Sequence, residues 1–82
     1  MADDRDIITH IDRLVDEEHA LERELAGKPT ADAAKQQRVA DLEVALDQCW
    51  DLLRQRRARR EMGDDPEDAQ VRDAGTVEGY QQ

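Results

Sequence analysis

The sequence predicts an all-α protein: an antiparallel two-helix hairpin followed by a short C-terminal helix or an extended tail. Two long stretches carry apolar residues at helical spacing, a Gly-Lys-Pro-Thr segment at 27–30 separates them, and no Gly or Pro interrupts residues 31–62. The chain has 82 residues, of which 38% are hydrophobic, and it lacks Phe. Because so few bulky side chains seldom form a self-sufficient core, we expect two hairpins to dimerise into a four-helix bundle.

The first helix is expected over about residues 4–26. Its apolar stripe alternates spacings of four and three residues and consists of Ile7, Ile11, Leu14, Glu18, Leu21 and Leu25, with Ile8 and Val15 on one flank. The aspartates at positions 3, 4 and 6 are N-cap candidates and suit the positive end of the helix dipole. Glu18 needs a partner at a core position, and we expect Arg38 or Lys35 to reach it across the hairpin.

The second helix is expected over about residues 31–62, with Thr30 as its N-cap and Gly63 at its C-terminal end. Because it is longer than the first helix, residues 54–62 either project beyond the hairpin or lie beside the acidic N-terminus. The apolar stripe is Val39, Leu42, Leu46, Cys49 and Leu53, broadened by Ala45, Trp50 and Leu52. The candidate core or dimer anchors are Leu42, Leu46, Cys49, Trp50 and Leu53.

The chain thus divides into a hairpin at residues 1–62 and an acidic tail at residues 63–82. Asp65-Pro66 is typical of a capped helix start, so a short helix is expected to about Ala74. Residues 76–80 show no periodicity, which indicates an extended or disordered end.

A dense arginine cluster occupies residues 54–62, between two acidic stretches of a chain whose net charge is −9. Its members are Arg54, Arg56, Arg57, Arg59 and Arg60. Arginine binds phosphate bidentately, so one hypothesis is a nucleic-acid or ribosome-associated factor. The other is that the arginines suit the negative end of the helix dipole and pair with acids of the same chain, its dimer mate or an acidic partner. The net charge and the lack of interleaved aromatics favour the second.

Metal and catalytic chemistry find little support. Asp16-Glu17-Glu18-His19 approaches the Glu-x-x-His pattern of di-iron bundles, but the first position is Asp and the facing stripe offers no carboxylate. A second histidine, His10, completes no ligand set, so we predict neither metal nor cofactor. Cys49 falls on the apolar stripe and is interpreted as a small core residue. No nucleophile–base pair or Gly-rich phosphate loop is apparent, so we predict a non-enzyme.

Composition also indicates the compartment. No apolar run approaches the ~20 residues that a membrane span requires, and no basic segment precedes an apolar one at the start. We therefore expect a cytoplasmic protein. The leading hypothesis is a homo-oligomeric protein–protein interaction or regulatory protein without catalytic activity.

The longest distinctive run is the Leu-Asp-Gln-Cys-Trp-Asp-Leu-Leu-Arg-Gln-Arg-Arg-Ala-Arg-Arg segment at 46–60, followed by Asp65-Pro66, Val71-Arg72 and the Thr-Val-Glu-Gly-Tyr motif at 76–80. With them, the chain resembles a family of short actinobacterial proteins known as a domain of unknown function. The resemblance covers nearly the whole chain, is weakest at about residues 27–38, and implies no activity, cofactor or partner. It does imply that the tail belongs to the domain. We therefore expect Val71, Val77 and Tyr80 to fold the tail back, bringing its acidic residues at 64, 65, 67 and 68 near the arginines.

Overall fold

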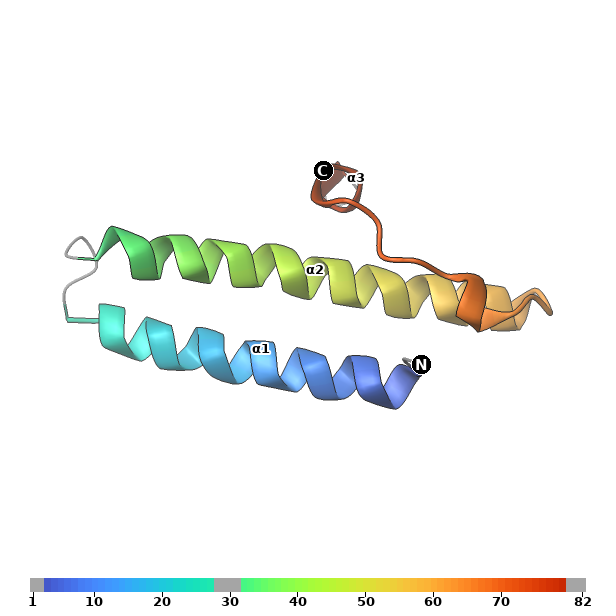
Figure 1. Ribbon diagram of the computed structural model, residues 1–82, viewed down its shortest axis with the longest axis horizontal. Helices are drawn as coiled ribbons and strands as arrows, with labels where there is room; N and C mark the ends of the chain where they lie inside the picture. The colour runs from blue at the N-terminus through green and yellow to red at the C-terminus, as the bar shows by residue number, and fades with distance from the viewer. Residues whose placement is uncertain (1–2, 28–31, 80–82) are drawn as a thin grey trace.

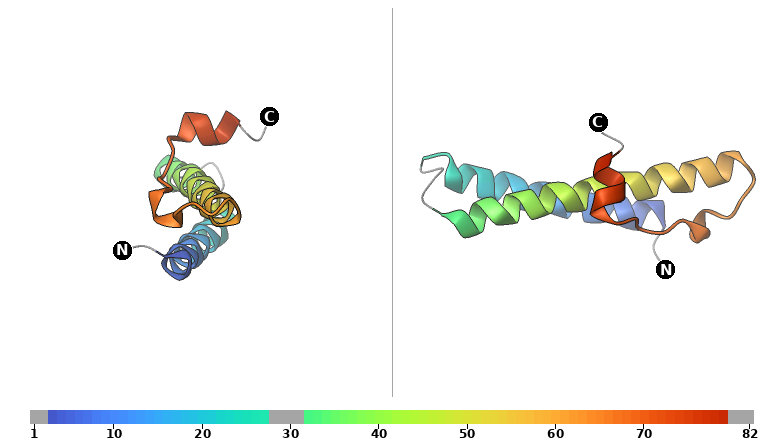
Figure 2. Two further views of the ribbon diagram at one scale, coloured as in Figure 1. Left: turned by 90° about the vertical axis from the view of Figure 1, so that its right-hand side faces the viewer. Right: turned by 90° about the horizontal axis from the view of Figure 1, so that it is seen from above.

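The computed structural model describes residues 3–27 and 32–79, to which the statements below refer. Its elements are α1 (Asp4–Leu25), α2 (Ala33–Glu61), the 3-10 turn η1 (Pro66–Asp68) and α3 (Ala74–Gly79). Helices α1 and α2 run antiparallel, and α3 lies on the side of α2 that faces away from α1 (Figure 1, Figure 2). The described residues contain no strand, so the predicted all-α hairpin is confirmed.

Helix α1 begins where its aspartates satisfy the free amides of the first turn. The Asp6 amide donates to the Asp3 carboxylate at 2.9 Å, and the Asp3 amide donates to the Asp6 carboxylate at 3.2 Å. This reciprocal capping box leaves Asp4 with its side chain available for another partner. The N-terminus of α1 is thus fixed locally, and it presents Asp4 toward the far end of α2.

Both ends of α2 are also fixed by local chemistry. The N-cap is Asp32, whose side chain accepts from the Lys35 amide at 3.0 Å; the expected cap, Thr30, lies outside the described residues. At the other end Gly63 adopts a φ of 80°, a left-handed conformation that Gly takes without strain. The Asp64 and Gly63 amides donate to the carbonyls of Arg59 and Arg60, which forms a Schellman motif. The chain therefore reverses sharply after α2.

The apolar core lies along the seam between α1 and α2. Its buried residues are Ile7, Ile11, Leu14, Leu42 and Leu46, and the partly buried residues packed on them are Val15, Leu21, Ala45, Cys49, Leu52 and Leu53. Of the expected core or dimer anchors, Trp50 is not a core residue, because 48% of it is exposed. Ile8, on the flank of the α1 stripe, is 47% exposed. The apolar stripes are wider than the contact between two helices, so their flank stays in solvent.

The tail differs from its predicted local structure. The helix that begins at Pro66 ends at Asp68 as a 3-10 turn and does not continue to Ala74. Residues 69–73 instead have no regular secondary structure, and α3 forms over residues 74–79, where an extended or disordered end was expected. Gln55 donates to the Gln70 carbonyl at 2.8 Å and Gln48 donates to the Arg72 carbonyl at 3.2 Å. Contacts with α2 thus replace the helical hydrogen bonds that local propensity favoured.

Helix α3 starts at an aspartate that the sequence reading had not assigned as a cap. The Asp73 carboxylate accepts from the Thr76 amide at 2.9 Å and from its hydroxyl at 3.1 Å. The helix crosses α2 on its back (Figure 2) and buries Val77 completely. Val71, expected to pack inward, is 62% exposed, and Tyr80 lies outside the described residues. A single valine therefore provides the fully buried apolar contact of the described tail.

Candidate interaction surface

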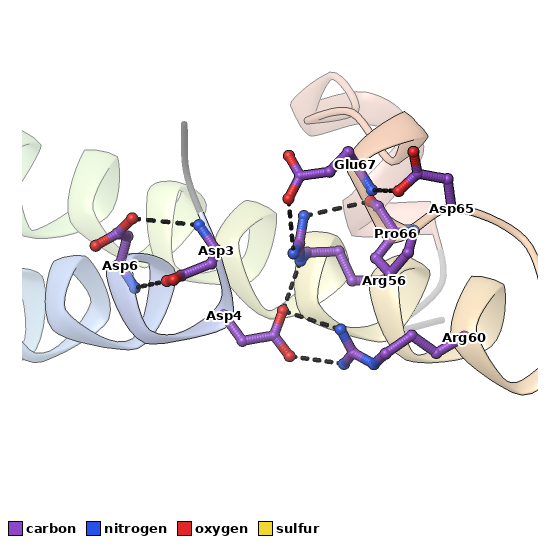
Figure 3. Close-up of polar contacts among 8 residues, drawn as sticks. All are labelled: Asp3, Asp4, Asp6, Arg56, Arg60, Asp65, Pro66 and Glu67. Atoms are coloured by element: carbon purple, nitrogen blue, oxygen red, sulfur yellow. Dashed lines mark hydrogen bonds and ion pairs between the residues drawn. The ribbon is translucent and has the colours of Figure 1, made fainter.

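Arg56 is the most enclosed member of the arginine cluster, with 6% of its surface exposed. Its guanidinium donates to the Asp4 carboxylate at 2.5 Å, and to the Pro66 carbonyl and the Glu67 carboxylate at 3.3 Å each (Figure 3). Three separate segments, α1, α2 and η1, therefore meet on one side chain. The contact with Asp4 places the C-terminal end of α2 beside the N-terminus of α1, which decides between the two placements the sequence left open.

Arg60 completes this group by donating to the two Asp4 carboxylate oxygens at 2.6 and 3.3 Å. Hydrogen bonds from Arg60 and then Arg56 lower the pKa of Asp4 below its ordinary value of 3.8. The same contact with Asp4 raises the pKa of Arg56. Two of the five clustered arginines are thus ion-paired within the chain.

A second polar group, which the sequence did not reveal, holds the tail on the back of α2. The fully buried Asp51 carboxylate accepts a bidentate pair of hydrogen bonds from Arg72, one of them 2.9 Å long, and another from Gln55 at 2.9 Å. The bonds from Arg72 contribute most to lowering the pKa of Asp51. The sequence contained one indication of this polar group: Asp51 and Gln55 are one helical turn apart, on the side of α2 opposite the apolar stripe.

The three remaining arginines of the cluster have fewer ionic contacts. Arg54 is exposed and lies 3.9 Å from Asp51. Arg57 and Arg59 have no ion pair among the described residues, and Arg57 is exposed. With Trp50 and Leu53, Arg54 and Arg57 line a shallow hollow of about 190 Å³. The side of α2 that carries Trp50 therefore combines an exposed indole with two exposed guanidinium groups.

An apolar groove of about 340 Å³ opens on the other side of the seam. It is lined by Asp6, Ile7, His10, Ala45, Gln48, Cys49, Leu52 and Val71. Burial raises the pKa of the Cys49 thiol, which keeps the sulfur protonated and poorly nucleophilic. The described residues hold no group of three or more side chains suited to a metal, and His10 and His19 are both exposed.

Glu18 has a different environment from the one expected. The expected partners are engaged elsewhere: Arg38 forms a bidentate pair with Glu17, at 2.6 and 2.9 Å, and Lys35 contacts Glu24 at 3.1 Å. Desolvation, followed by repulsion from Glu22 and Glu43, raises the pKa of Glu18 above 4.5. Three carboxylates, two from α1 and one from α2, thus lie near one another, and the neighbouring His19 opposes their effect on the pKa of Glu18.

These features define a class of protein: a small α-helical hairpin with a C-terminal segment clamped to its second helix by ion pairs. In the described residues no helix is long and apolar enough to cross a membrane. The chain belongs to a family described as a protein of unknown function (DUF2630), whose model matches residues 3–82. The resemblance drawn from the sequence motifs is therefore confirmed.

Similar chains occur in mycobacteria. A protein of Mycobacterium bovis and two proteins from strains of Mycobacterium tuberculosis, all described as uncharacterized, are 49% identical to this chain over 77 residues. The similarity covers 94% of this chain and 88% of each relative. No solved structure matches the chain significantly.

Proposed function

We propose that the protein is a non-catalytic, helical protein–protein interaction module that acts in the cytoplasm. The observation that carries this proposal is the exposed apolar surface beside the seam, where Trp50 and Ile8 are each nearly half exposed. Tryptophan and arginine are the residues that recur at the energetic centres of protein interfaces, and here they lie side by side on an exposed surface. The free thiol of Cys49 fits a reducing compartment.

The charge distribution supports a protein partner over a nucleic acid. Arg56 and Arg60 form ion pairs with Asp4 and Glu67, so fewer arginines of the cluster are available to bind phosphate than the sequence contains. The net charge of −9 further opposes approach to a polyanion. We expect no retention of an RNA or DNA oligonucleotide at 50 mM salt, the condition most favourable to phosphate contacts.

Site-specific photocrosslinking in living cells tests this function. A photoreactive amino acid at Trp50 or Ile8 is expected to give discrete protein adducts, because both positions lie on the proposed surface. The matched control is Asp41, an exposed residue about half a turn around α2 from Trp50. Equal adducts from all three positions, or none from any, would contradict an interaction role for this surface.

A further inference from the structure

Trp50 and Ile8 lie on the same face of the hairpin, opposite the apolar groove. Residues two apart in an α-helix point in directions about 200° apart. His10 and Gln48 line the groove, so Ile8 and Trp50, each two residues away, must lie on the other side of α1 and α2. We call this side, with its partly buried neighbours Val15 and Leu53, the Trp50 face.

Charges of opposite sign flank the centre of the Trp50 face. Glu43, Trp50 and Arg57 follow one another at intervals of seven residues, which places them on one side of α2. Trp50 is midway, about 10.5 Å along the helix from each charged residue. Arg54 lies beside Arg57 at the basic end, where both line the same hollow.

The acidic end extends onto α1. Glu18 and Glu22 lie close enough to Glu43 for the mutual repulsion to act on Glu18. In the described residues none of these carboxylates has an ion pair. The face is therefore acidic, apolar and basic in turn along α2. Glu43 and Arg57, at its two ends, have no ion pair within the part of the chain that the structure describes.

We propose that the Trp50 face binds a second copy of this chain about a two-fold axis near Trp50, with α2 antiparallel to α2 and Glu43 of each copy against Arg57 of the other. This inference rests on the proposed function and names its partner. A two-fold interface must be self-complementary. When the two α2 helices are antiparallel, the acidic end of each face lies against the basic end of the other, which meets this condition. Parallel helices would instead place acidic against acidic and basic against basic ends.

Two further features favour a second copy as the occupant. In the part of the chain that the structure describes, the core contains five buried aliphatic residues and gains one valine from the tail, which is small for a stable domain. Pairing through the Trp50 face covers the wide flank of both apolar stripes and closes a four-helix arrangement. A nucleic acid on the same face would meet Glu18, Glu22 and Glu43 at one end, which repel phosphate.

Sedimentation velocity of the full-length protein across a concentration series measures this association. We expect a concentration-dependent dimer, and we expect Trp50→Ala to raise its dissociation constant about 30-fold or more, as for a central interface aromatic. Circular dichroism establishes that the variant keeps its helices. This is expected because the indole is half exposed and contributes little to the seam.

Charge reversal tests the antiparallel register. Arg57→Glu and Glu43→Arg are each expected to weaken the dimer about tenfold, since symmetry turns each substitution into two repulsive contacts. The double variant is expected to return to within about threefold of the wild type. Within one chain the two residues are about 21 Å apart along α2, so monomer stability does not couple them. The matched control is Arg59→Glu, which makes the same charge change about half a turn around the helix from Trp50.

Each other outcome overturns the inference in a distinguishable way. A monomer at every concentration removes the second copy as partner, while Trp50-dependent crosslinks to another protein would preserve the proposed function. If the effects of the two reversals add in the double variant, the antiparallel register is wrong. An RNA oligonucleotide retained by the wild type and lost in Arg57→Glu would assign the face to nucleic acid and overturn both proposals.

Discussion

The two sides of α2 are held by different interactions. Its front packs on α1 through the aliphatic side chains of the seam, led by Leu42, of which 1% is exposed. Its back holds the tail through a buried carboxylate, Asp51, with Arg72 and Gln55, and through one buried valine. Apolar burial is non-directional and depends on area, whereas a buried ion pair depends on geometry and on charge state. The hairpin and the tail should therefore respond differently to mutation and to pH.

The largest effect is expected at the seam. Leu42→Ala removes a fully packed side chain and should lower the free energy of unfolding by about 2–5 kcal/mol. A domain with so few core residues has little stability to lose, so both regions should unfold together. Thermal unfolding followed by circular dichroism measures this. The control Val71→Ala, which truncates an exposed side chain of the tail, should leave the melting curve nearly unchanged.

A smaller and more local effect is expected at the tail. Asp51→Asn removes the charge that Arg72 pairs with and should cost about 1–3 kcal/mol, because the guanidinium remains partly solvated. Hydrogen exchange should accelerate over residues 69–79 while the amides of the α1–α2 seam remain protected. Asp47→Asn is the matched control, since Asp47 has no ion pair among the described residues. Equal acceleration in both variants would show that Asp51 does not hold the tail.

Lowering the pH should unfold the tail before the hairpin, without any mutation. The pKa values of Asp51 and Asp4 are lowered in the folded state, so their contributions are present above the ordinary pKa of 3.8 and are lost as the pH falls below it. The Val77 methyl resonances should then move toward their random-coil positions in an NMR titration. The Leu42 methyls should move at lower pH, and simultaneous movement of both would contradict separate control of the tail.

Glu18 should give the smallest effect, with the opposite sign. Its pKa is raised in the folded state, so the charged carboxylate destabilises the hairpin above that pKa and this penalty is relieved as the pH falls toward 4.5. Glu18→Gln is expected to stabilise the hairpin at neutral pH by a few tenths of a kcal/mol, about the size of one like-charge helix pair. Urea unfolding at pH 7 measures the gain. At pH 4 the variant and the wild type should differ less, and a constant difference would remove the electrostatic explanation.

Local patterns predicted the hairpin well but the tail poorly. The stripe that contains Ile7, Ile11 and Leu14 and the one that contains Leu42 and Leu46 identified all five core residues of the seam. The helix predicted from Pro66 to Ala74 was wrong, and of the two roles predicted for Trp50, core residue or dimer anchor, its exposure excludes the first and leaves the second a prediction. A periodic stripe shows which side of a helix is apolar, but not how much of that side a neighbouring helix covers.

The arginine cluster shows the same division. Charge counting indicated that its members pair with acids of the chain, and Arg56 and Arg60 do so through Asp4. Which arginines are enclosed and which remain free depends on the reversal at Gly63 and on the path of the tail. Glu67, which pairs with Arg56, lies 11 residues further along the sequence, beyond the end of α2. The spacing of residues along α2 could not predict that contact.

The sequence by itself determined the two long helices, their antiparallel pairing and the aliphatic seam, because helical periodicity, Gly and Pro positions and capping aspartates act over a few neighbouring residues. The tertiary structure alone decided that Asp51 is buried against Arg72, that residues 69–73 form no helix and that Trp50 faces solvent. These outcomes depend on contacts between segments distant in the sequence, where the gain from pairing and burial outweighs local preference. The order of charged and apolar residues around Trp50 is present in the sequence of α2. Whether these side chains are exposed depends on how α1 and the tail pack on that helix.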